Sequence, residues 1–94
     1  MAEILVINPN SSVSVTQSMD TCLDAVRSLS GHTLRCSTLE KSPPGIETDA
    51  HIVAVIPHLL ERIADMPADA YVVGCFSDPG LESARASTRK PVVG

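Results

Sequence analysis

The sequence has few aromatic residues, no cluster of basic residues and no long apolar run. Its 94 residues include no tryptophan, one tyrosine and one phenylalanine, so the stacking platforms typical of single-stranded nucleic-acid binding are missing. Seven basic and eleven acidic side chains give a formal charge of −4, which argues against nucleic acid and anionic membranes as partners. Every apolar run is far shorter than the roughly 20 residues of a membrane span. We therefore expect neither a nucleic-acid nor a membrane partner.

The three cysteines form no C-x-x-C pair; they are Cys22, Cys36 and Cys75. An odd count without metal-like spacing is typical of reduced thiols, and the first 20 residues contain no apolar run of signal-peptide length. We therefore expect a cytoplasmic protein. His51 and His58 are seven residues apart and have no third ligand beside them, so the sequence predicts no metal site.

Two nucleotide-binding signatures are also missing, the G-x-G-x-x-G fingerprint and the phosphate-binding P-loop. Backbone amides in such loops hold the phosphates, so the sequence does not favour a simple nucleotide-binding domain. No arginine lies between Cys75 and Glu82, which excludes the Cys-loop-Arg pattern of thiol phosphatases.

What the chain does contain is an alternation of short apolar runs and helical patterns. Four segments are predicted as strands, namely residues 4–7, 32–39, 70–74 and 91–94. Three helices are predicted between them, over about 12–30, 48–63 and 81–87. Strands joined by helical crossovers imply a parallel sheet with helices on both faces. The sequence thus predicts a single α/β domain, residues 1–94, with a four-stranded parallel sheet in a flavodoxin-like three-layer sandwich.

Two details of the helices carry further expectations. The first helix shows one apolar stripe, predicted to face the core: Val15, Met19, Cys22, Val26 and Leu29. We accordingly expect Cys22, and also Cys36 in the second strand, to be packing residues. Pro57 lies inside the second helix, where a kink or a restart is expected.

Ligands of open parallel sheets bind beyond the carboxyl ends of the strands. Two loops have that position, residues 8–12 after the first strand and residues 74–80 after the third. In the usual flavodoxin-like order these strands are neighbours, so both loops are expected to border one crevice.

Cys75 is the strongest candidate for chemistry, because it stands where a strand ends and a helix soon begins. Asp78 is expected to cap that helix, whose free backbone amides would stabilise a thiolate. Gly74 would let a substrate approach, and the amides of Phe76 and Ser77 can donate to an oxyanion. The alternative is that Cys75 simply packs at the strand end.

The first loop offers Asn10, Ser11 and Ser12, whose side chains and amides can bind a carboxylate or an amide. The alternative is that these residues only form a turn and cap the following helix.

The two loops together resemble the aspartate/glutamate/hydantoin racemase superfamily, and most closely its hydantoin racemases. The likeness rests on Val-Ile-Asn-Pro-Asn-Ser-Ser at residues 6–12 and Val-Gly-Cys-Phe-Ser-Asp-Pro-Gly-Leu at residues 73–81. Residues 45–47 and 89–94 are also similar to that family. The resemblance implies a cofactor-independent enzyme of two α/β lobes, with no cofactor and with one cysteine from each lobe acting on opposite faces of a stereocentre.

Residue by residue, the resemblance makes Cys75 the first-lobe cysteine and Asn10, Ser11 and Ser12 substrate contacts. It makes Phe76 and Ser77 the segment whose amides hold substrate oxygens. The implied substrate is a hydantoin or another small carboxylate or amide.

This chain departs from the pattern because the second lobe and its cysteine are missing. We therefore expect half an active site, truncated relative to the family, that needs a second lobe or forms a homo-oligomer. Two alternatives remain open. One is a lobe of a related maleate isomerase or arylmalonate decarboxylase, and the other is a non-catalytic binding or dimerisation module.

Overall fold

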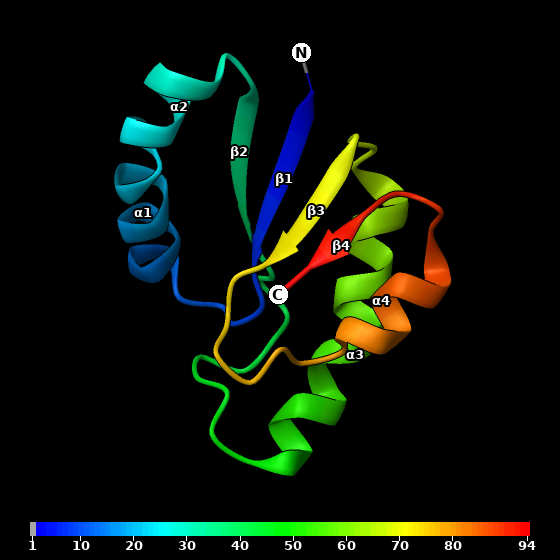
Figure 1. Ribbon diagram of the computed structural model, residues 1–94. Coiled ribbons are helices and arrows are strands. Elements are labelled where there is room, and N and C mark those ends of the chain that lie inside the picture. Colours follow the sequence, from blue (N-terminus) through cyan, green and yellow to red (C-terminus); the bar gives the residue numbers. More distant parts are fainter. Residues whose placement is uncertain (1) are drawn as a thin grey trace.

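A computed structural model of the chain describes residues 2–94, and Figure 1 shows them as a parallel sheet flanked by helices. In chain order the elements are β1 (Glu3–Asn8), α1 (Val13–Cys22), α2 (Asp24–Ser30), β2 (Thr33–Thr38), α3 (Asp49–Asp65), β3 (Ala70–Val73), α4 (Leu81–Ser87) and β4 (Val92–Val93). All strand pairs are parallel, in the order β2-β1-β3-β4. The predicted fold class is therefore confirmed.

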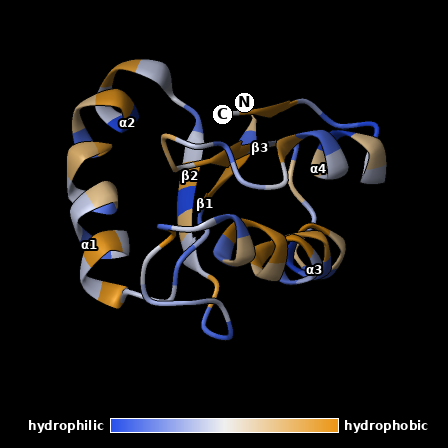
Figure 2. Ribbon diagram, turned by 90° about the horizontal axis from the view of Figure 1, so that it is seen from below, coloured by the Kyte–Doolittle hydropathy of each residue, from blue (hydrophilic) through white to orange (hydrophobic). Residues whose placement is uncertain are grey.

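The helices divide between the two faces of the sheet, as Figures 1 and 2 show. The chain steps from β1 to β2 in one direction and from β2 across to β3 in the other. Because crossovers between parallel strands are right-handed, α1 and α2 lie on one face while α3 and α4 lie on the other. Among residues 2–94, no helix has both the length and the apolar character needed to cross a membrane.

The hydrophobic core lies mainly on the face covered by α3 and α4. Its buried side chains come from β1, the start of the loop after β2, α3, β3, α4 and β4: Leu5, Ile7, Leu39, Val55, Leu59, Ile63, Tyr71, Val73, Ala84 and Val92. The Tyr71 hydroxyl has one hydrogen, which the carbonyl oxygens of Ile63 and Met66 share as acceptors, each at 3.2 Å. This contact fixes the end of α3 against β3.

The prediction of one long first helix with a buried apolar stripe is wrong. The helix is broken at Leu23 into α1 and α2, and neither part has a buried residue. Leu29 is 88% exposed, and Cys22 is exposed rather than packed in the core. The physical reason is that α1 packs against the edge strand β2, so much of the apolar stripe of α1 and α2 is not covered by other parts of residues 2–94. Gly31 ends α2 in the left-handed conformation (φ 70°), as expected of a helix stop.

Helix α3 begins as predicted, with the Thr48 hydroxyl accepting a hydrogen bond from the His51 amide at 3.1 Å. The expected restart at Pro57 does not occur, since α3 is one continuous helix with Pro57 inside it. Pro57 points to solvent, while Val55, Leu59 and Ile63 of the same helix are buried against the sheet. Packing of these three side chains favours the helix on both sides of the proline.

Candidate functional site

The two candidate loops leave the same edge of the sheet, because β1 and β3 are neighbours. The Gly74 amide donates to the carbonyl oxygen of Ile7 at 2.9 Å, which joins the starts of the two loops. The two loops therefore start side by side, at Asn8 and Gly74.

Asn8 organises the first loop, although sequence analysis did not single it out. It is 1% exposed, and its side-chain nitrogen donates to Asn10 Oδ1 at 2.8 Å and to the Ser12 carbonyl and Thr16 Oγ1 at 3.0 Å each. Its Oδ1 accepts from the Asn10 amide at 3.2 Å. The sequence feature that could have pointed to Asn8 is its position as a polar residue at the end of an apolar strand, directly before a proline.

The three residues of this loop that were predicted to contact a substrate mostly form hydrogen bonds within the loop and with nearby backbone groups. Asn10 Oδ1 accepts from the Ser12 amide at 2.9 Å, and Ser12 Oγ caps α1 by accepting from the Val15 amide at 3.4 Å. The Ser11 amide donates to the Pro43 carbonyl at 3.0 Å. Within residues 2–94, the Asn10 side-chain NH₂ and the Ser11 hydroxyl have no hydrogen-bond partner, so these two groups remain open to a ligand.

Cys75 lies half-buried in the second loop, at the end of β3. Its Sγ is 3.5 Å from Ser77 Oγ, and its carbonyl accepts from the Asp78 amide at 3.1 Å in a tight turn. The backbone amides of Phe76 and Ser77 donate to no other group in the described part of the chain. A thiol and two uncommitted amide donors thus lie in the same short loop.

The expected helix cap at Asp78 is wrong. Helix α4 starts at Leu81 with Gly80 as its N-terminal cap, and Asp78 itself has a left-handed backbone (φ 46°). The Asp78 carboxylate lies instead against the backbone of Gly94, where no Cβ would fit. Because of the tight turn and Gly80, five residues separate Cys75 from Leu81, the first residue of α4.

Gly74 has a second role, in packing. A Cβ at this position would lie 2.5 Å from Met19 Cε and 3.4 Å from the Ile7 carbonyl oxygen. The space beside Gly74 is therefore filled by the flexible end of the Met19 side chain, which a larger residue at position 74 would have to displace.

Clefts or cavities of about 300–1000 Å³ are typical of small-molecule sites, and an open one of about 620 Å³ adjoins Cys75. It is lined by residues of α1, β3, the second loop and the chain after β4: Val15, Val72, Val73, Gly74, Cys75, Phe76, Asp78 and Gly94. The structure thus brings Cys75 and Phe76 to one cavity. Asn10, Ser11 and Ser12 lie outside its lining, and Ser77 is connected to it through its contact with Cys75.

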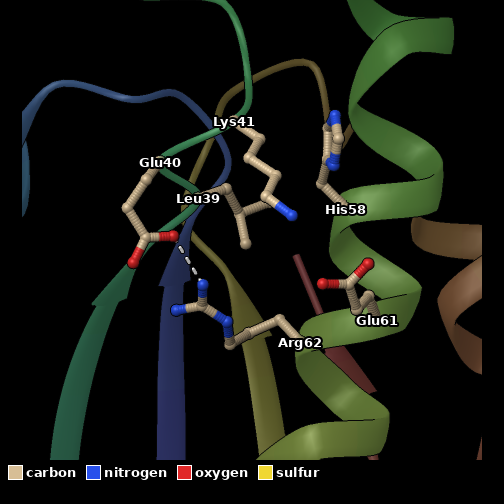
Figure 3. A pocket seen from close by; sticks show the side chains of 6 residues that line it. All are labelled: Leu39, Glu40, Lys41, His58, Glu61 and Arg62. Carbon is tan, nitrogen blue, oxygen red and sulfur yellow. Dashed lines mark hydrogen bonds and ion pairs between the residues drawn. The ribbon is translucent and has the colours of Figure 1, made fainter.

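A second, much smaller hollow of about 40 Å³ lies between the loop after β2 and α3. Figure 3 shows Arg62 reaching across it to Glu40, whose Oε2 accepts from the guanidinium at 2.6 Å. Arg62 also donates to the Thr38 carbonyl at 3.1 Å and to the Ser37 hydroxyl. Backbone hydrogen bonding and the Arg62 guanidinium lower the pKa of Glu40. The hollow is too small for a substrate, and its contacts fasten the end of β2 to α3.

The other candidate groups do not join the cavity. Cys36 is half-buried in β2, and its pKa is raised by burial and by the nearby Asp20 carboxylate, which favours the neutral thiol. No group of three or more His, Cys, Asp or Glu side chains in residues 2–94 is arranged to hold a metal ion. Cys75 is therefore the one cysteine among the residues that line the cavity.

The fold and the site together define a parallel α/β lobe with a thiol at the carboxyl end of a central strand. The family model described as Asp/Glu/Hydantoin racemase matches residues 4–94, and the chain belongs to this family. It is 37% identical to a hydantoin racemase of Paenarthrobacter aurescens, with 97% of this chain and 40% of that protein covered. It is 38% identical to a hydantoin racemase of Rhizobium meliloti, with 97% and 39% covered.

A solved structure, the allantoin racemase from Klebsiella pneumoniae, superposes with a TM-score of 0.89 at 31% identity. The match covers 100% of this chain and 39% of that one. The chain therefore spans about two fifths of the length of these relatives, consistent with one lobe.

Proposed function

We propose that this chain is one lobe of a cofactor-independent racemase for a hydantoin or a related small carboxylate or amide, with Cys75 as an acid/base at the substrate stereocentre. The observation that carries the proposal is the Cys75 thiol on an open cavity beside the unpaired amides of Phe76 and Ser77. Membership of the racemase family and the similarity to hydantoin and allantoin racemases support it.

The proposed chemistry follows from the acidity of a carbon-bound proton next to a carbonyl group. The Cys75 thiolate removes this proton, and the electron pair moves onto the carbonyl oxygen to give an enolate. The amides of Phe76 and Ser77 donate to that oxygen where negative charge develops, which is how preorganised donors lower a barrier. The Ser77 hydroxyl, 3.5 Å from Sγ, is placed to hydrogen-bond the thiolate.

The free polar groups of the first loop hold the substrate in this proposal. The Asn10 NH₂ donates to a carbonyl or carboxylate oxygen, and the Ser11 hydroxyl either donates or accepts. Ser12 contributes indirectly, because its hydroxyl caps α1 and keeps the loop in place.

Racemisation also needs a proton donor on the face opposite to the base. Cys22 at the end of α1 and Cys36 in β2 are both absent from the lining of the cavity beside Cys75. The chain therefore supplies one of two acid/base groups, and a second lobe or a second copy supplies the other. We also propose a cytoplasmic location, because the three cysteines are unpaired. We propose that neither nucleic acid nor a membrane is a partner.

Proton NMR of an enantiopure 5-substituted hydantoin in D₂O tests the proposal. We expect the α-proton signal to disappear with the unaltered protein and to persist with Cys75→Ala. Cys22→Ala is the matched control, since Cys22 is exposed and outside the cavity, and it should exchange normally. EDTA should not slow the exchange.

Equal exchange with Cys75→Ala would refute the acid/base role of Cys75. Absence of exchange in every variant, with the substrate still bound, would favour the non-catalytic binding module. Release of carbon dioxide from an arylmalonate, or isomerisation of maleate, in place of exchange would assign the lobe to the related decarboxylases or isomerases.

A further inference from the structure

The buried side chain of Asn8 is held in one orientation. Its nitrogen faces three acceptors, namely Asn10 Oδ1, the Ser12 carbonyl and the Thr16 hydroxyl, and its oxygen faces the Asn10 amide. The Thr16 hydroxyl is itself held by the Thr38 hydroxyl at 2.6 Å. Turning the Asn8 amide by half a revolution would set its oxygen against these acceptors and its NH₂ against a donor. Because Asn8 is 1% exposed, solvent does not compensate for the wrong orientation.

Asn8 in turn orients the side chain of Asn10. The Asn10 Oδ1 accepts from the Asn8 NH₂ at 2.8 Å and from the Ser12 amide at 2.9 Å, which occupies both lone pairs of that oxygen. A reversed Asn10 amide would bring its NH₂ against these two donors. The NH₂ is therefore the group that is left free, and within residues 2–94 it has no hydrogen-bond partner. Asn10 thus offers a ligand two donor hydrogens and no acceptor.

We propose that Asn8 is a positioning residue that makes Asn10 a donor-only contact. The first loop then selects a carbonyl or carboxylate oxygen of the substrate and rejects an N–H or ammonium group. An N–H of the ligand would meet the Asn10 NH₂ and leave both donors unpaired, which is costly where water is excluded. The selection rests on the proposed function, in which Asn10 contacts the substrate, whereas the orientation of the two amides rests on the hydrogen bonds alone.

The chemistry of a hydantoin gives this selection a purpose. The hydantoin ring carries N–H groups directly beside carbonyl groups, so a site has to distinguish neighbouring positions of opposite hydrogen-bonding character. The backbone amides of Phe76 and Ser77 in the second loop are also donors only. Donor-only contacts from both loops admit oxygens and refuse N–H groups, which limits the ways in which the ring can be turned beside Cys75.

Asn10→Asp tests the orientation without any ligand. An aspartate keeps an oxygen for the hydrogen bonds from Asn8 and Ser12, and it loses only the unpartnered NH₂. We expect the urea midpoint to stay the same or to rise, because the carboxylate also lies just before the N-terminus of α1. Asn10→Ala removes the oxygen and should lower the midpoint. A lowered midpoint in Asn10→Asp would mean that the loop holds the NH₂ instead, and it would overturn the proposal.

Binding of 5-methylhydantoin, followed by ¹⁵N NMR of the backbone amides of residues 74–77, tests the positioning. Asn8→Asp replaces the donor that faces Asn10 with an acceptor, which reverses the preferred orientation of the Asn10 amide. A preference reversed by about one hydrogen bond leaves roughly a tenth of the molecules competent to bind, so the dissociation constant should rise about tenfold. Asn10→Asp should raise it by at least about as much.

Thr38→Val is the matched control, because it removes a hydroxyl from the same network without touching Asn10. It should leave the dissociation constant unchanged, and circular dichroism checks that each variant folds. If Asn8→Asp does not fold, Asn10→Asp decides, and an unchanged dissociation constant in that variant refutes the donor contact.

A double-mutant cycle separates positioning from a merely structural role. In an Asn10→Ala chain there is no side-chain amide to orient, so Asn8→Asp should not weaken binding further. If Asn8→Asp weakens binding equally with and without the Asn10 side chain, Asn8 acts through the fold alone and the proposal is overturned.

The α-proton assay distinguishes this proposal from the proposed function. Binding that depends on Asn8 and Asn10 in this way, without Cys75-dependent exchange, would refute the acid/base function and leave the positioning role standing. Cys75-dependent exchange that Asn10→Asp leaves unchanged would refute the positioning role alone. If the unaltered chain does not bind 5-methylhydantoin, both proposals are overturned.

Discussion

Replacing Asn8 with alanine should destabilise the fold by about 3 kcal/mol, because one buried amide holds the first loop in place. Its nitrogen carries two hydrogens, which three acceptors share, and its oxygen accepts one further hydrogen bond from the Asn10 amide. Three hydrogen bonds at about 1 kcal/mol net each give this estimate. It is a large part of the 5–15 kcal/mol, roughly, that stabilises a typical domain.

Urea unfolding followed by circular dichroism measures this loss, and Asn10→Ala provides the comparison. Asn10 is partly exposed and contributes one side-chain acceptor, so its replacement should cost roughly half as much. A loss below about 1 kcal/mol for Asn8→Ala would mean that the loop does not depend on the buried amide, and the explanation given for its shape would be incorrect.

Three further predictions concern groups outside the cavity, and each is checked by urea unfolding. Thr48→Ala should cost about 1 kcal/mol, because it removes the side-chain cap of α3; an unchanged midpoint would contradict this role. Ser42→Ala should raise stability by up to about 1 kcal/mol, since the buried Ser42 hydroxyl has no partner within residues 2–94; a loss would show that it is hydrogen-bonded. Glu40 has a lowered pKa in the folded chain, so its contribution is present above the unfolded carboxyl pKa and is lost as the pH falls through the folded one. Glu40→Gln should therefore be slightly less stable at pH 7, by about 0.5 kcal/mol or less for so exposed a pair with Arg62, and this gap should close in acid.

The sequence predicted the strands well, because their patterns are local, and the usual flavodoxin-like order correctly placed the first and third strands side by side. Residues 4–7 and 70–74 are apolar on both faces and became the two central strands. The prediction for the first helix was wrong because hydrophobic periodicity reveals an apolar stripe but not whether another element covers it. Val26 and Leu29 have the spacing of core residues, yet the sheet offers them no surface to pack on.

Only part of the site could be predicted, again because residue spacing reveals local patterns but not contacts between distant segments. Cys75 was visible because a strand end before a glycine-bounded turn is a local pattern. The wrong cap at Asp78 and the unforeseen role of Asn8 both depend on contacts between segments. Asp78 meets Gly94, and Asn8 meets Thr16 of α1, neither of which residue spacing reveals.

The lack of buried residues in α1 and α2 has a consequence for local unfolding. Much of α2 is held by Arg27, which donates to the Leu34 carbonyl at 2.8 Å and to the Asp20 and Asp24 carboxylates. Elements with few buried apolar contacts open at far lower free energy than the core. The amides of α2 should therefore exchange with deuterium long before those of β1, and each opening would uncover the thiol of Cys36. The rate at which a bulky thiol reagent labels Cys36 would then report how often α2 opens and exposes this side of the sheet to solvent.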